Sequence, residues 1–544
     1  MNSAELFIRC LQNEGTEYLF GLPGEENIDV MDAILDSQIQ FILTRHEQGA
    51  AFMADVYGRL TGSAGVCLAT LGPGATNLIT GVADANMDRA PLVAIAGQGA
   101  TTRMHKESHQ ILDLVNLFEP VTKYATEVRA PEVIPEVVRK AFKVAQAEKP
   151  GASFISLPEN IAGMSIKSTE SLTVQSAMAP APSEVKLRQA AKLISEARFP
   201  IVMAGNGVIR GNASNNLVQF AEALGLPVAT TFMAKGAMPW SHDLSLGTVG
   251  LQANDYVSCG FNRADVVICV GYDVVEYHPS LWNPDRGIRI VHIDSQPAEV
   301  DSHYSLEVGV VGDIGRALDG ISDLATPRGE TATANLRATI LEEFNSYSND
   351  PGFPLKPQRI VRDLREALEP EDIVISDVGA HKMWMARMYQ AERPNTCLIS
   401  NGFASMGISV PGAIAAKLAY PERTAVAVTG DAGFLMNSQE IETALRLGLG
   451  IVILIWTDSE YGLIRWHQMK RFGRESHIAF NNPDFVKYAE SFGAKGYRVE
   501  SADDLIPTLK RAISDDTVVL IDCPVDYREN MKLTAKFGEL VCPV

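Results

Sequence analysis

The sequence lacks the features that mark membrane, secreted and nucleic-acid-binding proteins. No apolar run approaches the about 18 residues that a membrane-spanning helix needs, and the longest one, at residues 449–456, has the length of a strand. Residues 1–5 lack the basic and apolar regions of a signal peptide. Basic residues are outnumbered 47 to 66 by acidic ones. The resulting formal net charge of −19 argues against a nucleic-acid or anionic-membrane partner.

Cysteine is scarce, and its spacing carries no pattern. The seven cysteines form no CxxC pair: Cys10, Cys67, Cys259, Cys269, Cys397, Cys523 and Cys542. A disulfide framework or a zinc site would need closer or more regular spacing. We therefore expect reduced thiols, several of them buried in strands, in a cytoplasmic protein.

The 544 residues contain instead a threefold alternation of apolar strands and helices. Short, continuous apolar segments end in glycine-rich or charged turns and precede helical patterns in each third of the chain. Such strands predict parallel sheets covered on both faces. Polar stretches with several prolines, near residues 168–183 and 326–357, separate the thirds. We expect an α/β fold with three consecutive doubly wound parallel-sheet domains, at residues 1–167, 184–325 and 355–544.

Two carboxylates follow consecutive strands of the last third. Asp431 follows Gly430 and precedes Ala432 and Gly433, and Asp458 ends the next strand. A single βαβ crossover brings the two strand ends side by side. A carboxylate pair with bare backbone amides suits a hard dication that bridges to a phosphate. For either residue alone, a helix cap or a surface turn is the alternative.

Further turns follow predicted strands. Glycine-containing ones lie at residues 377–381 and 401–407 in the last domain and at 20–24 and 71–77 in the first, where a charged turn also lies at 44–48. In parallel sheets such strand ends form concave, amide-lined ligand sites, whereas any single turn is also explained as an ordinary loop. Glu47 stands at the second strand end, before an apolar helix. Favourable placement at a helix N-terminus explains this position, and so does a proton shared with a ring nitrogen of a ligand.

Residues 20–24, Arg45-His46-Glu47, residues 72–77 and Gly430-Asp431 with Asp458 together resemble thiamine-diphosphate enzymes of the acetohydroxyacid (acetolactate) synthase group. The resemblance covers essentially the whole chain. It implies a pyrimidine-binding first domain, a central domain and a diphosphate-binding third domain. It also implies a homodimer or homotetramer that uses thiamine diphosphate and Mg²⁺ and acts on small 2-oxo acids.

The resemblance also assigns roles to individual residues. Glu47 would share a proton with the aminopyrimidine ring, whose imino nitrogen removes the proton from the thiazolium C2. Asp431 and Asp458, with the backbone carbonyl of Glu460, would ligate Mg²⁺. Met406 would hold the cofactor bent. The implied cofactor-binding set is Gly24, Gly72, Asn77, Gly379, Ala380, His381, Met406, Gly430, Ala432 and Gly433. The implied substrate side is His109, Gln110 and His467, with Gln110 also among the catalytic residues.

Departures from the group's usual pattern favour its catabolic, FAD-independent branch. The usual metal motif reads Gly-Asp-Gly and ends in Asn-Asn, whereas this chain has Gly-Asp-Ala at residues 430–432 and Thr-Asp at 457–458. The turn at residues 271–277 lacks the Gly-Ala-Arg-Phe-Asp pattern of FAD-carrying synthases. His467 replaces a Trp that selects 2-ketobutyrate. Residues 205–211 are one position off GxGxxG, and a plain turn explains them better than a dinucleotide site.

We interpret the chain as an acetolactate synthase. It would decarboxylate pyruvate and transfer the hydroxyethyl carbanion to a second pyruvate, giving 2-acetolactate and CO₂. The nearest alternative is another thiamine-diphosphate-dependent 2-oxo acid carboligase or decarboxylase, including an FAD-containing biosynthetic acetohydroxyacid synthase subunit. A catalytically silent regulatory relative is the alternative from a different class. The sequence leaves open the acceptor, the pathway, a regulatory subunit, and the role of Glu25-Glu26-Asn27.

Overall fold

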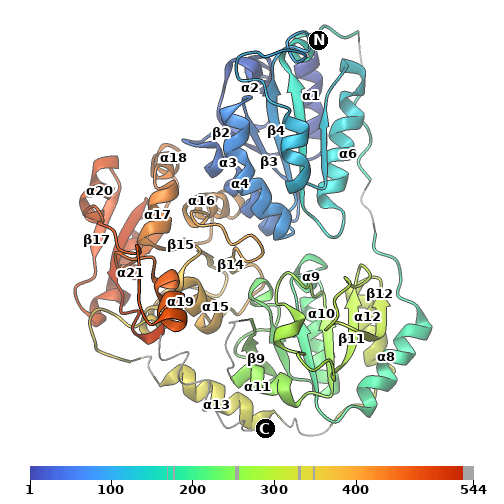
Figure 1. The fold of residues 1–544 in the computed structure, drawn as a ribbon, viewed down its shortest axis with the longest axis vertical. Helices are drawn as coiled ribbons and strands as arrows, with labels where there is room; N and C mark the ends of the chain where they lie inside the picture. The colour runs from blue at the N-terminus through green and yellow to red at the C-terminus, as the bar shows by residue number, and fades with distance from the viewer. Residues whose placement is uncertain (168–169, 176–177, 251–255, 329–332, 347–348, 531–544) are drawn as a thin grey trace.

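The computed structural model describes the chain except for residues 168–169, 176–177, 251–255, 329–332, 347–348 and 531–544. Three α/β domains follow one another, and each contains a six-stranded sheet with helices around it (Figure 1). Neighbouring strands in all three sheets run parallel. This arrangement confirms the predicted fold class.

The first sheet has the strand order β2-β1-β3-β4-β6-β5. Its turns after β1, β2 and β3 meet at one edge, because the carboxyl ends of parallel strands lie together. The elements are α1 (Ser3–Asn13), β1 (Tyr18–Gly21), α2 (Ile28–Leu35), β2 (Gln40–Leu43), α3 (Glu47–Thr61), β3 (Gly65–Ala69), α4 (Pro73–Met87), β4 (Leu92–Gln98), α5 (Leu114–Phe118), β5 (Tyr124–Glu127), α6 (Ile134–Gln146), β6 (Ala152–Pro158) and α7 (Glu159–Ala162).

The central sheet has the order β12-β11-β10-β7-β8-β9. Read from the topological switch between β10 and β7, it has the doubly wound arrangement of dinucleotide-binding sheets. The elements are α8 (Glu184–Glu196), β7 (Pro200–Ala204), α9 (Gly207–Arg210), α10 (Ser214–Leu224), β8 (Val228–Thr230), β9 (Ser245–Thr248), α11 (Tyr256–Arg263), β10 (Val266–Val270), β11 (Arg289–Asp294), β12 (Leu306–Val311), α12 (Ile314–Ser322) and α13 (Ala334–Asn345).

The third sheet, ordered β14-β13-β15-β16-β18-β17, repeats the strand order of the first. The two outer domains therefore have their ligand-binding edges at equivalent places. The elements are α14 (Pro357–Ala367), β13 (Ile373–Ser376), α15 (Ala380–Met388), β14 (Cys397–Ile399), α16 (Ser409–Ala419), β15 (Ala425–Gly430), α17 (Asp431–Asn437), α18 (Glu440–Arg446), β16 (Ile451–Thr457), α19 (Gly462–Phe472), α20 (Phe485–Phe492), β17 (Lys495–Arg498), α21 (Leu505–Ser514) and β18 (Val519–Pro524).

Helix α3 packs against α4 of its own first domain and against α16 of the third domain. Small residues make these close approaches possible. A Cβ atom on Gly81 of α4 would lie 2.5 Å from the Cβ of Ala51 in α3. A Cβ atom on Gly412 of α16 would lie 3.0 Å from a methyl carbon of Val56, also in α3. One buried apolar cluster consequently contains residues of the first and third domains. Glu47, the first residue of α3, is placed by this junction.

The cysteines follow the expectation at most described positions. Cys10, Cys67, Cys269, Cys397 and Cys523 are buried free thiols. Cys259 is disulfide-bonded, so the expectation of reduced thiols is wrong for this residue. Cys542 lies outside the described residues.

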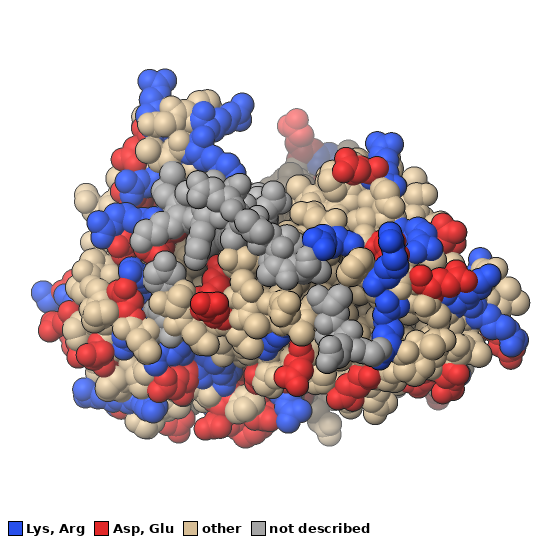
Figure 2. All heavy atoms as spheres, turned by 90° about the horizontal axis from the view of Figure 1, so that it is seen from below, with Lys and Arg blue, Asp and Glu red and all other residues tan. Residues whose placement is uncertain are grey.

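In the described part of the chain, no helix has the length and apolarity needed to cross a bilayer. On the face shown in Figure 2, acidic and basic side chains are interspersed among neutral ones.

Candidate active site

Glu47 lies at the N-terminus of α3, where the side-chain amide of Asn77 holds its carboxylate from one side. His46 caps the helix through its Nδ1 atom, which accepts a hydrogen bond from the Gln48 amide at 3.1 Å. The Glu47 carboxylate accepts a hydrogen bond from the Asn77 side chain at 2.9 Å. A Cβ atom on Gly74 would lie 3.3 Å from the same carboxylate. Predicted residues from two neighbouring turns thus meet around one half-buried carboxylate.

The other predicted turns of the first domain are packed just as closely. A Cβ atom on Gly24 would lie 2.3 Å from the Cβ of Thr70, so only glycine fits there. Gly72 has a φ of +54°, and a Cβ atom on it would lie 2.9 Å from the backbone oxygen of Gln110. Gln110 therefore lies beside the Gly72 turn. His109 and Gln110 are both exposed.

The segment Glu25-Glu26-Asn27 has a structural role at the carboxyl edge of the first sheet. The Asn27 side chain accepts a hydrogen bond from the Gly24 amide at 2.8 Å. Glu26 accepts a hydrogen bond from the Thr70 hydroxyl at 3.0 Å. The first contact closes the first turn on itself and the second fixes it against the third turn, which the sequence did not indicate.

Asp431 lies at the predicted metal site and accepts several hydrogen bonds there. It is 1% exposed, and its carboxylate accepts hydrogen bonds from the Asp458 and Ser459 amides at 3.2 and 2.7 Å and from the Asn482 side chain at 2.7 Å. The two predicted carboxylates are therefore adjacent, as the strand order β15–β16 requires. Asn482 was missed in the sequence because it follows no predicted strand. Its Oδ1 atom is buried without a hydrogen-bond partner among the described residues.

The electrostatics of this pair fit a dication. Burial, followed by repulsion from Asp431, raises the pKa of Asp458 to about 8. Burial also raises the pKa of Asp431. A buried carboxylate and a half-buried neighbour are costly to ionise together, and a divalent cation removes that cost. The described residues contain no group of three or more His, Cys, Asp or Glu able to hold a metal. Carbonyl and phosphate oxygens would have to complete the shell.

The backbone at Glu460 is consistent with a carbonyl ligand. The Glu460 side chain pairs with Arg465 at 2.9 Å, so its carboxylate is engaged elsewhere. Glu460 forms an antiparallel bridge with Ala479, whose hydrogen bonds run from the neighbouring amides of Tyr461 and Phe480. The bridge therefore leaves the Glu460 carbonyl unused.

His381 lies between the two glycine turns predicted to contact a diphosphate. A Cβ atom on Gly379 would lie 2.9 Å from its ring, and one on Gly430 would lie 3.4 Å from its Nδ1. Burial lowers the pKa of His381 to about 3, so the imidazole is neutral. Its Nε2 atom is buried and has no hydrogen-bond partner within the described part of the chain. An unpartnered ring nitrogen beside two bare turns marks a place for a polar ligand.

Asp377 holds the loop that carries Met406. Its buried carboxylate accepts hydrogen bonds from the amides of Val378, Gly407 and Ser409 at 2.8 to 3.0 Å. Gly407 has a φ of +94°, which favours glycine. A Cβ atom on Gly433 would lie 3.0 Å from the same carboxylate. Asp377 was predicted only as part of a turn, and its anchoring contacts depend on residues some 30 positions away.

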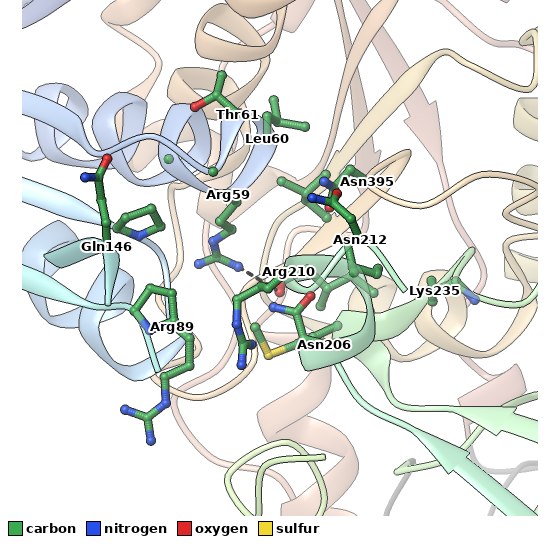
Figure 3. Close-up of a pocket in the computed structure, with 18 of the residues that line it drawn as sticks. Arg59, Leu60, Thr61, Arg89, Gln146, Asn206, Arg210, Asn212, Lys235 and Asn395 are labelled. Carbon is green, nitrogen blue, oxygen red and sulfur yellow. Dashed lines mark hydrogen bonds between the residues drawn. The ribbon is translucent and has the colours of Figure 1, made fainter. Parts of the chain in front are cut away.

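A cavity of about 270 Å³ lies apart from these residues, where the three domains meet (Figure 3). None of the predicted site residues lines it. Its arginines are paired: Arg59 with Asp55, Asp84 and Asp88 at 2.6 to 2.9 Å, Arg89 with Asp273 at 3.0 Å, and Arg210 with Glu148 at 3.1 Å. The cavity is thus the centre of an ionic junction between domains.

The predicted residues form two groups, on the first and third domains. No hydrogen bond among the described residues joins a predicted residue of one group to a predicted residue of the other. The residues Gln48 and Asn437, which lie beside the two groups, do bond at 3.4 Å. His467 is exposed on α19 and contacts only its neighbour Trp466 among aromatic rings of the described chain.

Three family models match the chain in the order of its domains. They are the N-terminal TPP binding domain of thiamine pyrophosphate enzymes at residues 1–117, their central domain at 187–321, and their C-terminal TPP binding domain at 377–523. The chain belongs to the thiamine pyrophosphate enzymes. The two matched TPP binding domains contain all the residues that were predicted to bind the cofactor.

Relatives that align with nearly the whole chain show to which group of thiamine pyrophosphate enzymes it belongs. It is 38% identical to "Acetolactate synthase" of Bacillus subtilis, over 99% of the chain and 96% of the relative. It is 37% identical to "Acetolactate synthase, catabolic" of Raoultella terrigena, over 97% and 96%. It is 36% identical to "Probable acetolactate synthase large subunit" of Methanocaldococcus jannaschii, over 99% and 94%. The resemblance found in the sequence is confirmed: this is a member of the acetolactate synthase group.

Proposed function

We propose that the protein is an acetolactate synthase that converts two pyruvates into 2-acetolactate and CO₂. The observation that carries the proposal is the composition of the two residue groups. One presents a carboxylate, Glu47, for a ring nitrogen, and the other presents an adjacent carboxylate pair, Asp431 and Asp458, for a dication. Two relatives, each aligned over 96% of its own length, are named acetolactate synthases.

The third domain would bind the charged end of the cofactor. Asp431, Asp458 and the Glu460 carbonyl would hold Mg²⁺, whose charge would balance that of the diphosphate. His381 and the amides of the Gly379 turn would contact phosphate oxygens. Bound thiamine diphosphate supplies the carbanion chemistry, while the protein supplies position and protons.

The first domain would bind the pyrimidine end. Glu47 would hold or release a proton at the ring nitrogen, and Asn77 keeps its carboxylate in place. Gln110 beside Gly72 would face the substrate. Met406, on the loop anchored by Asp377, would supply an apolar support that keeps the two reacting ends together.

We infer that a second copy of the chain completes each site. Exposed apolar side chains flank both residue groups: Ile28 and Leu112 in the first domain, and Phe403, Leu435 and Met436 in the third, between 38% and 64% exposed. Helix α19 contains no buried residue. Apolar surface of this kind marks an interface, and a symmetric homodimer covers it twice. A tetramer would pair two such dimers.

We also propose that the central domain carries no FAD. In a sheet of this order, a dinucleotide binds where β7 and β10 diverge. Here the two turns touch, because a Cβ atom on Gly205 would lie 2.4 Å from the Gly271 carbonyl oxygen. The buried carboxylate of Glu276 accepts a hydrogen bond from the Asn206 amide at 3.1 Å and another from the Thr231 hydroxyl. A carboxylate already takes the donors that a cofactor phosphate would need.

The product spectrum from pyruvate alone tests the proposed function. Purified protein with Mg²⁺ and thiamine diphosphate should release one CO₂ per 2-acetolactate. Acetaldehyde as the main product would indicate a decarboxylase. No CO₂ release from protein that binds the cofactor would indicate a silent regulatory relative. Stoichiometric flavin absorbance in the purified protein would contradict the proposal that the central domain carries no FAD.

A further inference from the structure

Glu440 is a buried carboxylate that the site described so far does not use. It begins α18 in the third domain, and its side chain is 0% exposed. Among the described residues it forms no ion pair with a Lys or Arg. Burial raises the pKa of Glu440 to about 7. An unpaired buried carboxylate is costly unless hydrogen bonds compensate it.

The hydrogen bonds that compensate Glu440 come mainly from the first domain. Its Oε1 atom accepts one from the amide of His46 at 3.1 Å and one from the amide of Arg45 at 3.1 Å. Its Oε2 atom accepts one from the Thr443 hydroxyl at 2.7 Å. Arg45 and His46 immediately precede Glu47. A residue almost 400 positions away thus binds the backbone that leads into Glu47.

The contact continues along the first turn of α3. A Cβ atom on Gly49 would lie 2.7 Å from Oε1 of Glu440, so the carboxylate is seated directly against the helix start. A negative charge at this place also interacts favourably with the helix dipole. On the opposite side, Asn77 holds the Glu47 carboxylate itself. Glu440 therefore fixes the backbone of Glu47, and Asn77 fixes its side chain.

We propose that Glu440 is a positioning residue for Glu47. By binding the amides of Arg45 and His46, it sets where the Glu47 carboxylate meets the pyrimidine ring of the cofactor, and it makes this geometry depend on the docking of the third domain. The inference rests on the proposed role of Glu47. Misplacing a reacting group by about 1 Å costs roughly 10²-fold in rate.

Two variants of Glu440 separate hydrogen bonding from charge. Glu440→Gln keeps the length and one acceptor oxygen for the two amides but removes the charge. Glu440→Asp keeps the charge but withdraws the carboxylate by one methylene. Glu440→Ala removes both. Glu442→Gln, on the partly exposed side of the same helix where Glu442 pairs with Arg446, is the matched control.

Two readouts follow the position of Glu47 without measuring turnover. Amide hydrogen exchange of residues 45–46 in the cofactor-free protein reads the contact itself. Exchange of the C2 proton of bound thiamine diphosphate into D₂O reads the proton removal that Glu47 promotes. Cofactor affinity should stay within about threefold in all four variants, because the diphosphate end is unchanged.

We expect Glu440→Ala to lose protection at residues 45–46 and to slow C2 exchange about 100-fold. Glu440→Gln should keep most of both, and Glu440→Asp should fall between them. Wild-type C2 exchange in a folded Glu440→Ala that has lost the protection would overturn the inference. Faster C2 exchange in Glu440→Asp than in Glu440→Gln would also overturn it, since charge would then matter more than hydrogen bonding. If Glu440→Ala does not fold, this order of the other two variants decides.

Failure of the proposed role of Glu47 would look different. Glu47→Gln with wild-type C2 exchange would contradict that role whatever the Glu440 variants do. Loss of amide protection in Glu440→Ala would then still establish the contact but no longer a positioning effect on catalysis.

Discussion

Replacing Asp458 by Asn should stabilise the cofactor-free protein while weakening its metal site. Burial and the neighbouring Asp431 raise the pKa of Asp458 from 3.8 to about 8. Between these two values the folded chain binds a proton that the unfolded chain has released. The free energy of unfolding therefore falls as the pH rises through this window. Asn has nearly the same shape and no titration, so it removes this penalty.

The size of the effect follows from the pKa shift. Each unit of difference corresponds to about 1.4 kcal/mol. From pH 4 to pH 7 the penalty reaches about 4 kcal/mol, which is an upper limit for a group that is not fully enclosed. We expect Asp458→Asn to raise the free energy of unfolding by about 2 to 4 kcal/mol at pH 7 and by little near pH 4.

Urea unfolding in EDTA at several pH values measures this difference. The exposed Asp504→Asn should leave both stability and its pH dependence unchanged. With Mg²⁺ and thiamine diphosphate added, the wild type should gain more stability than Asp458→Asn, because a carboxylate binds the dication more strongly than an amide oxygen. An Asp458→Asn protein no more stable than the wild type at pH 7 in EDTA would refute the reasoning.

The remaining predictions concern cofactor, assembly and substrate. Glu47→Gln should bind thiamine diphosphate but lose activity by roughly 10²- to 10⁴-fold, and full turnover in steady-state assays would contradict its role. In light scattering the active species should be a dimer or larger, so a monomer with full specific activity would exclude the shared site. Colourless protein should prefer pyruvate to 2-ketobutyrate as acceptor when both products are quantified in an equimolar mixture. The preference should be partial, since one methylene is worth only about 1 to 3 kcal/mol.

The residues that could be predicted from the sequence share one property: each follows an apolar strand. Parallel strands bring their carboxyl ends to one edge, so the succession of strands and turns is enough to assign Glu47, Asp431 and Asp458 to ligand-binding edges. The adjacency of the two aspartates follows from neighbouring strands β15 and β16. Local pattern and sheet topology together suffice for residues of this kind.

The residues that could not be predicted depend on contacts distant in sequence. Asn482 binds Asp431 from a segment without a strand, and Glu440 reaches the start of α3 from another domain. Nothing in the neighbouring sequence distinguishes Glu440 from a more exposed residue of the same helix, such as Glu442. His467 stays a prediction, because its side chain is exposed on α19 and contacts none of the other predicted residues that the structure describes.

The topology of the three sheets explains why two of them hold predicted site residues and one does not. In the first and third domains the strand order reverses between β1 and β3 and between β13 and β15, and open glycine turns follow these strands. In the central domain the order reverses between β7 and β10, where Gly205 and Gly271 touch and Glu276 takes the free amide of Asn206. The same kind of sheet edge is thus available three times. The central edge differs in the close approach of its two turns, which lie so near each other that a Cβ atom on Gly205 would be 2.4 Å from the Gly271 carbonyl oxygen.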